Sequence, residues 1–265
     1  MKMGTRPKLI EFKKYVSVKL SHLKAYFYFL FIPQKPNATR VLIFAQGRTG
    51  STLLEELLGS TSYFGKGGEL LGDSGTKVKY PYQFVSGIAN KASNKNFIFH
   101  LKIYHLTRDR TRKIEPSSFL KKLQENGWKI VYLQRKNKLN HVLSNTIAEA
   151  RSGFHKYDNQ TEKFSFNLEA KHVVEKIEER ARFENAELAA LSGLDFLKIT
   201  YEDDLKDANN HQNTVNKILD HLGLERKECR TSLKKINRSA QRDVIENYDE
   251  VITHLRENNM AHHIE

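Results

Sequence analysis

Cysteine is almost absent from this chain, since Cys229 is the only one among 265 residues. An internal disulfide framework is therefore excluded, and such cysteine usage fits a reducing, cytoplasmic compartment. The 11 histidines show no zinc-type spacing with cysteine, so we expect no metal site. Helix-turn-helix, zinc-finger and aromatic RNA-binding patterns are missing too. We therefore expect no nucleic-acid partner, despite a net charge of +13.

Long hydrophobic runs are also missing. The longest, residues 25–32, is rich in Tyr and Phe but far shorter than the about 20 residues that cross a bilayer. It also lacks the aliphatic core and small-residue cleavage site of a signal peptide. The run lies in a basic arm, residues 1–40, which holds nine Lys or Arg and one acid, Glu11. Two interpretations stay open: the aromatic side chains pack against the domain, or the arm makes a peripheral contact with the inner face of an anionic membrane.

Beyond the arm, strand patterns alternate with helical patterns. We expect strands at 41–46, 97–104, 128–134 and 195–200, and helices at 51–60, 82–90, 116–126, 138–152, 167–191, 211–222 and 244–255. This order predicts a single α/β domain, residues 41–265, with a mostly parallel central sheet covered by helices. A loop is expected at 65–75, and the charged helix 167–191 is expected to be an outer, solvated element. Ligands of such sheets bind beyond the carboxyl ends of the strands.

The first strand runs into a polar turn and then into a helix, and this junction predicts an anion site. The free N–H groups of the helix, its positive dipole end and nearby hydroxyls form a cradle. Arg48 adds a planar cation suited to a phosphate or a sulfonate. Unlike the P-loop of nucleoside triphosphatases, the turn has no Lys before its hydroxyls, which favours a phosphosulfate bound without a metal. The cradle residues are Gly47, Arg48, Thr49, Gly50, Ser51 and Thr52.

A second anion-binding element follows the strand at 128–134. Arg135 leaves the end of that strand, Asn137 is a suitable helix N-cap, and Ser144 follows nine residues after Arg135. An Arg and a hydroxyl so placed can share one phosphate. Because Arg48 and Arg135 both leave strands at the carboxyl edge of a parallel sheet, we expect them in one crevice.

Together the two elements resemble the sulfotransferases that use 3′-phosphoadenosine 5′-phosphosulfate. Residues 47–54 are similar to the family's 5′-phosphosulfate loop, and residues 135–144 are similar to its 3′-phosphate element. The pattern is most like that of the bacterial glycolipid and nodulation-factor sulfotransferases. Residues 150–155 resemble their Ala-x-x-x-Gly-Phe/Trp-His tail, with two residues in place of three between Ala and Gly. Residues 197–203, and then 218–224, are similar to their Tyr-Glu-Asp-Leu segment and the helix that follows it. The resemblance covers about residues 40–225. It implies a metal-independent transfer of a sulfuryl group to a hydroxyl of a carbohydrate or glycolipid.

The resemblance also nominates catalytic residues. Glu69, in the loop after the first helix, corresponds to the family's general base, although here Gly-Gly precedes it and Leu follows it. Lys102 resembles the family's active-site Lys, which would stabilise the leaving phosphate. His105 is an alternative base, as in cytosolic sulfotransferases. Successive side chains of a strand point to opposite faces, so in the expected strand 97–104 Lys102 lies on one face and His105, just beyond it, on the other.

A second function stays open beside sulfuryl transfer. A metal-free nucleotide-binding protein could keep the phosphate cradle without transferase activity. The presence of Glu69 and Lys102 beside both phosphate elements favours an enzyme.

Overall fold

A parallel β-sheet forms the centre of the molecule, and the computed structural model describes residues 6–92, 96–154, 164–233 and 241–264. Within these residues the sheet has five strands, all parallel, in the order β2-β3-β1-β4-β5. The predicted α/β architecture is therefore confirmed. The strands are β1 (Arg40–Ala45), β2 (Phe64–Lys66), β3 (Asn96–Leu101), β4 (Trp128–Gln134) and β5 (Phe196–Thr200).

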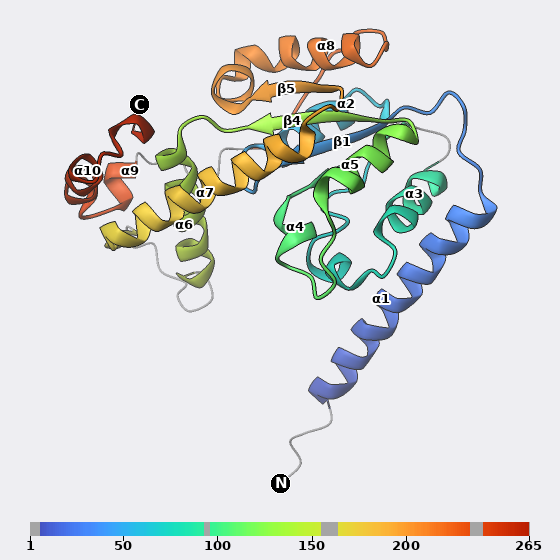
Figure 1. The fold of residues 1–265 in the computed structure, drawn as a ribbon, viewed down its shortest axis with the longest axis horizontal. Coiled ribbons are helices and arrows are strands. Elements are labelled where there is room, and N and C mark those ends of the chain that lie inside the picture. Colours follow the sequence, from blue (N-terminus) through green and yellow to red (C-terminus); the bar gives the residue numbers. More distant parts are fainter. Residues whose placement is uncertain (1–5, 93–95, 155–163, 234–240, 265) are drawn as a thin grey trace.

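Helices cover both faces of this sheet (Figure 1). They are α1 (Arg6–Phe31), α2 (Ser51–Ser60), α3 (Pro81–Lys91), α4 (Tyr104–Thr107), α5 (Pro116–Glu125), α6 (Lys138–Phe154), α7 (Ala170–Leu191), α8 (His211–His221), α9 (Gln241–Val244) and α10 (Tyr248–Glu257). Short helical turns lie at Asp73–Lys77, Tyr201–Leu205, Ala208–Asn210 and Ala261–His263. Helices α6, α7 and α10 pack together at one end of the sheet around an apolar cluster of their own.

Strand β1 is buried along its whole length because apolar side chains leave it on both faces. Leu42 and Phe44 pack towards α3 and α5, in the cluster that also holds Trp128. Val41 and Ile43 pack towards α2 and α8. A strand covered on both faces reads as a continuous apolar run, which explains why the sequence pattern located it well.

The connections from β1 and β4 diverge at the carboxyl edge of the sheet, where such a topology predicts a crevice. Strand β1 lies between β3 and β4. The helix that follows β1, α2, covers one face of the sheet, whereas Ala190 and Leu191 at the end of α7 pack on the other. The place where two neighbouring strands connect to helices on opposite faces of the sheet is the usual ligand site of an open α/β sheet. Arg48 and Arg135 leave the sheet at this point.

Several predicted elements need correction. The expected strand 97–104 ends at Leu101, and the chain turns at once into α4. The expected loop 65–75 contains the edge strand β2 and a helical turn; three residues of β2 are too few to show a periodic pattern. The helix expected at 244–255 corresponds to α10, which begins at Tyr248, and a separate short helix, α9, ends at Val244.

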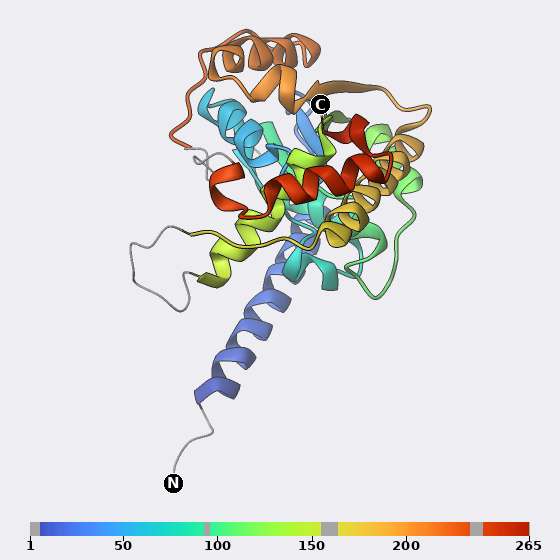
Figure 2. The same cartoon turned by 90° about the vertical axis from the view of Figure 1, so that its left-hand side faces the viewer.

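The basic arm contains a long helix, α1, whose second half packs on α3 while its first half points away from the body (Figure 2). Ala25 is fully buried there, and His22 meets the ring of Phe84 at a centroid distance of 5.2 Å. The side chain of Asn90 donates to the carbonyl of Ile32 at the helix end and to that of Tyr28, which also accepts from the N–H of Ile32. Among the described helices, none is long and apolar enough to cross a membrane.

Replacing Gly87 with Ala tests how α1 is attached. An added Cβ at Gly87 would lie 1.8 Å from the carbonyl oxygen of Ala25, which is backbone and cannot rotate away. We expect Gly87→Ala to lower the free energy of unfolding by about 3 kcal/mol. Gly59→Ala is the control, because its Cβ would meet only the flexible side chain of Lys66, and it should change stability by less than about 1 kcal/mol. Equal stabilities of the two variants in urea titrations would contradict this packing.

Candidate functional site

The turn between β1 and α2 has the backbone geometry of an anion cradle. Arg48 and Gly50 both have positive φ, at 68° and 95°, so the chain folds tightly enough to aim successive amides at one point. The hydroxyl of Thr49 donates to the carbonyl of Gln46 at 2.7 Å and closes the turn. Gly50 caps α2 without a side-chain hydrogen bond, and no acidic residue lies in the first turn. The N–H groups at this helix end are thus available to an external acceptor.

Gly47 is held from two sides. Its carbonyl accepts a hydrogen bond of 2.6 Å from Nε2 of His141, and its N–H donates to the hydroxyl of Tyr104 at 3.1 Å. A Cβ at this position would lie 2.8 Å from that hydroxyl, so a larger residue would displace the side chain of Tyr104. Complete burial of His141, with the nearby charge of Arg180, lowers its pKa well below the ordinary value and keeps it neutral.

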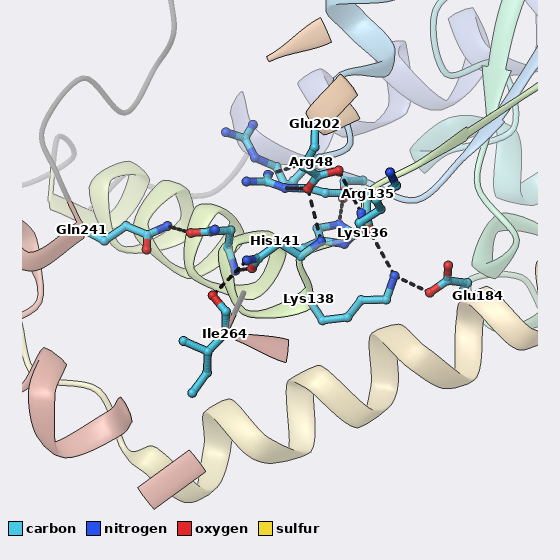
Figure 3. Close-up of polar contacts among 12 residues, drawn as sticks. Arg48, Arg135, Lys136, Lys138, His141, Glu184, Glu202, Gln241 and Ile264 are labelled. Carbon is cyan, nitrogen blue, oxygen red and sulfur yellow. Dashed lines mark hydrogen bonds and ion pairs between the residues drawn. The ribbon is translucent and has the colours of Figure 1, made fainter. Parts of the chain in front are cut away.

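Arg135 joins the second element to the cradle. One of its terminal nitrogens donates to the carbonyl of Arg48 at 3.0 Å, and its guanidinium lies 4.7 Å from the ring centre of Tyr201. Glu202 lies 3.8 Å from its Nε and also accepts from the backbone N–H groups of Lys136 and Asn137. Arg48, Arg135 and Glu202 gather at the start of α6 (Figure 3). The expected crevice therefore brings the two arginines together.

The segment Tyr201–Leu205 has a clear structural role. It forms a single π-helical turn, Tyr201–Leu205, directly after β5. Its Tyr and Glu side chains fix Arg135 by stacking and by charge. Burial has the largest effect on the pKa of Arg135 and lowers it, as does the neighbouring charge of Arg48. Tyr201 and Glu202 raise this pKa, but the net shift is downward.

Helix α6 carries Ser144 near the same crevice. The side chain of Asn137 accepts from the N–H of Asn140 at 2.7 Å, as predicted for its N-cap. Ser144 follows His141 by three residues, so both lie on the helix face that meets the cradle. No hydrogen bond in the described part of the chain joins Ser144 to Arg135. His155, at the end of the family-like tail, lies outside the described residues.

Glu69, Lys102 and His105 come together in one cluster. Nζ of Lys102 is 2.7 Å from Oε1 of Glu69, and Nε2 of His105 is 3.6 Å from Oε2. Nδ1 of His100 lies 3.8 Å from Glu69. The expectation that Lys102 and His105 lie on opposite faces of a strand is wrong. Strand β3 ends at Leu101, and the turn into α4 places His105 close to the carboxylate of Glu69.

This cluster adjoins the cradle. An added Cβ at Gly47 would lie 3.5 Å from Nζ of Lys102. Glu55, which lies on α2 behind the cradle, accepts from the N–H of Gly68 at 2.7 Å and so ties the Glu69 loop to that helix. The described residues therefore place the anion cradle beside a carboxylate, an ammonium and an imidazole.

Electrostatics set the charge of each group in this cluster. Burial favours a raised pKa for Glu69, but the hydrogen bond and charge of Lys102, with His100 and His105, outweigh it and lower the pKa. Burial, and then the charge of Lys102, lowers the pKa of His105 to about 4. At neutral pH the cluster thus contains a carboxylate, an ammonium and a neutral imidazole.

Helix α7 supports the site from behind, which contradicts its expected role as an outer element. Glu187 accepts hydrogen bonds from Gln46 at 3.2 Å and from the hydroxyl of Tyr132 at 3.3 Å. Glu184 pairs with Lys138, whose ammonium also donates to the carbonyl of Arg135 at 2.8 Å. Burial raises the pKa of Glu187 to about 8, so its carboxyl is mainly protonated at neutral pH. Sequence reasoning missed these residues because a charged helix pattern does not show which acids are buried.

Comparison with protein-family models and with curated proteins found no match for this chain. The interpretation of the site therefore depends on its own geometry and chemistry. Within the described ranges, no group of three or more His, Cys, Asp or Glu side chains could hold a metal ion.

The low pKa of His105 has a measurable consequence for stability. Because the folded state binds this proton less tightly than the unfolded state, with a pKa of about 4 against 6.5, stability rises with pH across that interval. Between pH 7 and pH 5 the wild type should lose about 2 kcal/mol more than His105→Asn, which cannot titrate. Urea unfolding at the two pH values measures this difference. Parallel loss in both proteins would contradict the neutral, buried imidazole.

Proposed function

We propose that the protein transfers a sulfuryl group from 3′-phosphoadenosine 5′-phosphosulfate to a hydroxyl group. The observation that carries the proposal is the meeting of two anion-binding elements, from β1 and from β4, in one crevice beside Glu69 and Lys102. A donor with a 5′-phosphosulfate and a separate 3′-phosphate needs two such elements. The order of the motifs along the chain, which resembles that of the sulfotransferases, also supports the proposal.

The residues present fit this donor. Nε of Arg48 is buried and has no hydrogen-bond partner among the described residues, so a donor remains for an incoming anion. The first turn of α2 carries no acid that would repel one. Residues 47–52 would hold the 5′-phosphosulfate, and Arg135 with Ser144 would hold the 3′-phosphate. When bound, the donor supplies the sulfuryl group that is transferred.

Glu69 is the proposed base. Its side chain is 38% exposed, whereas that of His105 is 5% exposed, so Glu69 is the one that an acceptor hydroxyl can approach. Lys102 lies between Glu69 and the cradle, where its charge would stabilise the phosphate that leaves. His105 is neutral at neutral pH and is the alternative base.

We propose a carbohydrate or glycolipid as the acceptor, on the basis of the resemblance to the bacterial glycolipid and nodulation-factor enzymes. The proposed location is the cytoplasm, with peripheral contact at the inner face of the membrane where a glycolipid would lie. A metal-free nucleotide-binding protein is the alternative. One observation favours the nucleotide-binding alternative: the ammonium of Lys102 and the carboxylate of Glu69 are already paired with each other.

Binding measurements test the two phosphate elements. Arg48→Ala and Arg135→Ala each remove a charge-assisted contact, so affinity for adenosine 3′,5′-bisphosphate should fall by about 10- to 150-fold, or about 1.5–3 kcal/mol. Arg226→Ala, which removes an exposed Arg paired with Asp220, is the matched control. Calorimetry should show that the wild type prefers the bisphosphate to adenosine 5′-monophosphate and that Arg135→Ala does not. A wild type that binds both nucleotides equally would refute the 3′-phosphate element.

Turnover measurements test the base. Glu69→Gln keeps the size of the side chain but cannot accept a proton, so the turnover rate should fall by about 10²- to 10⁴-fold with nucleotide binding almost unchanged. Glu56→Gln, on the exposed side of α2, is the control and should keep full activity. If His105→Ala shows the large loss and Glu69→Gln does not, the base is His105. Strict dependence on magnesium would indicate phosphoryl transfer instead.

A further inference from the structure

The helix α1 presents an apolar stripe to solvent. Seven large apolar side chains of this helix are at least one third exposed, whereas the rest of the described chain contributes three. The core of the stripe repeats at intervals of four and three residues, so its members lie on one helix face over about 21 Å. These core residues, with their exposed fractions, are Val16 (36%), Leu20 (50%), Leu23 (63%), Phe27 (55%) and Leu30 (70%).

The opposite face of α1 is already occupied. Ala25 and His22 are buried against α3, and Phe29 meets the ring of Tyr82 at a centroid distance of 5.9 Å. The backbone of α1 at Ala25 lies directly against Gly87, so a rotation of the helix would break this close contact. The stripe therefore faces outward because of the packing of α1, and it cannot be buried by a simple rotation. The two views of the fold show α1 standing clear of the other elements along its first half (Figures 1 and 2).

Charge decides which partner fits the stripe. Its four-three spacing is that of a coiled-coil seam, with Lys19 and Lys24 at the flanking positions where paired helices place opposite charges. No Asp or Glu occurs between Glu11 and Glu55, so a second copy would bring Lys against Lys along the seam. Exposed Lys13 lies on the same side of the helix as Lys24. An apolar stripe edged by lysines is instead complementary to a surface with apolar depth and negative headgroups.

We propose that this face of α1 binds an anionic lipid bilayer, with the stripe inserted at the headgroup boundary and the three lysines at the phosphates. The inference does not depend on the proposed sulfuryl transfer, because it uses no residue of the cradle or of the Glu69 cluster. The helix lies along the membrane surface and does not cross it.

Vesicle sedimentation with the full chain tests the apolar part of the proposal. The wild type should bind vesicles of phosphatidylglycerol mixed with phosphatidylcholine, and binding should weaken as salt is added. Leu20→Ser with Leu23→Ser should lower the partition coefficient by more than about 10-fold. Leu188→Ser with Leu233→Ser, which removes two leucines that are 43% and 46% exposed elsewhere, should leave it unchanged. Thermal unfolding should be the same for both pairs, because all four side chains are exposed.

The charge requirement is tested separately. Replacing Lys13, Lys19 and Lys24 with Gln should lower binding to the anionic vesicles on the order of 100-fold. Replacing Lys121, Lys129 and Lys206, three exposed lysines on other elements, changes the net charge equally and should have little effect.

Three results would overturn the proposal. One is a wild type that does not bind the anionic vesicles, and another is equal binding by the stripe and control variants. The third is a wild-type dimer in sedimentation that Leu20→Ser with Leu23→Ser converts to a monomer, without lipid binding by either, because a second copy would then cover the stripe. None of these outcomes affects nucleotide binding, so failure here is distinguishable from failure of the proposed sulfotransferase activity.

Discussion

The rest of the site depends on how the backbone of Gly47 is held. His141 reaches across from α6 to its carbonyl, and Tyr104 reaches from α4 to its N–H. These two contacts join the ends of β1, β3 and β4, the three central strands. Because Arg48 follows directly and its carbonyl anchors Arg135, the position of both guanidinium groups depends on one peptide unit. A site that must place two charges relative to a single ligand gains its accuracy from such a shared support.

Two groups behind the cradle, His141 and Glu187, are kept mainly uncharged at neutral pH. Burial leaves His141 neutral, and it raises the pKa of Glu187 to about 8. A charged Glu187 would partly neutralise the cradle from behind, whereas its protonated form supports Gln46 by hydrogen bonding alone. The positive potential of Arg48 and Arg135 is then directed outward. In the same layer Lys138 pairs with Glu184, and the charge of Arg180 lies near His141.

Local patterns located the elements, but they did not show which ones would support the site. The strands at 41–46 and 128–134 were predictable because both faces of each are covered over most of its length. They contain the apolar runs 41–45 and 130–133. Arg48 and Arg135 were predictable as neighbours because the carboxyl ends of parallel strands share an edge. His141, Glu187 and Tyr104 were missed because their roles come from contacts between residues far apart in sequence. His105 was expected on the wrong face because side chains alternate between the two faces only within a strand. No Gly or Pro in the sequence marks the end of β3.

The pairing of Glu69 with Lys102 connects the cradle to the proposed chemistry. In the described structure Lys102 holds the pKa of Glu69 down, which makes this carboxylate a weak base. Nζ of Lys102 is also close to the Gly47 end of the cradle, so a bound phosphate would compete with Glu69 for the same ammonium. As Lys102 turns towards the phosphate, the carboxylate would lose its hydrogen bond and its pKa would rise towards the ordinary value. Under the proposed function, occupation of the anion cradle thus strengthens the base that accepts the acceptor's proton, through a single side chain that lies between the two.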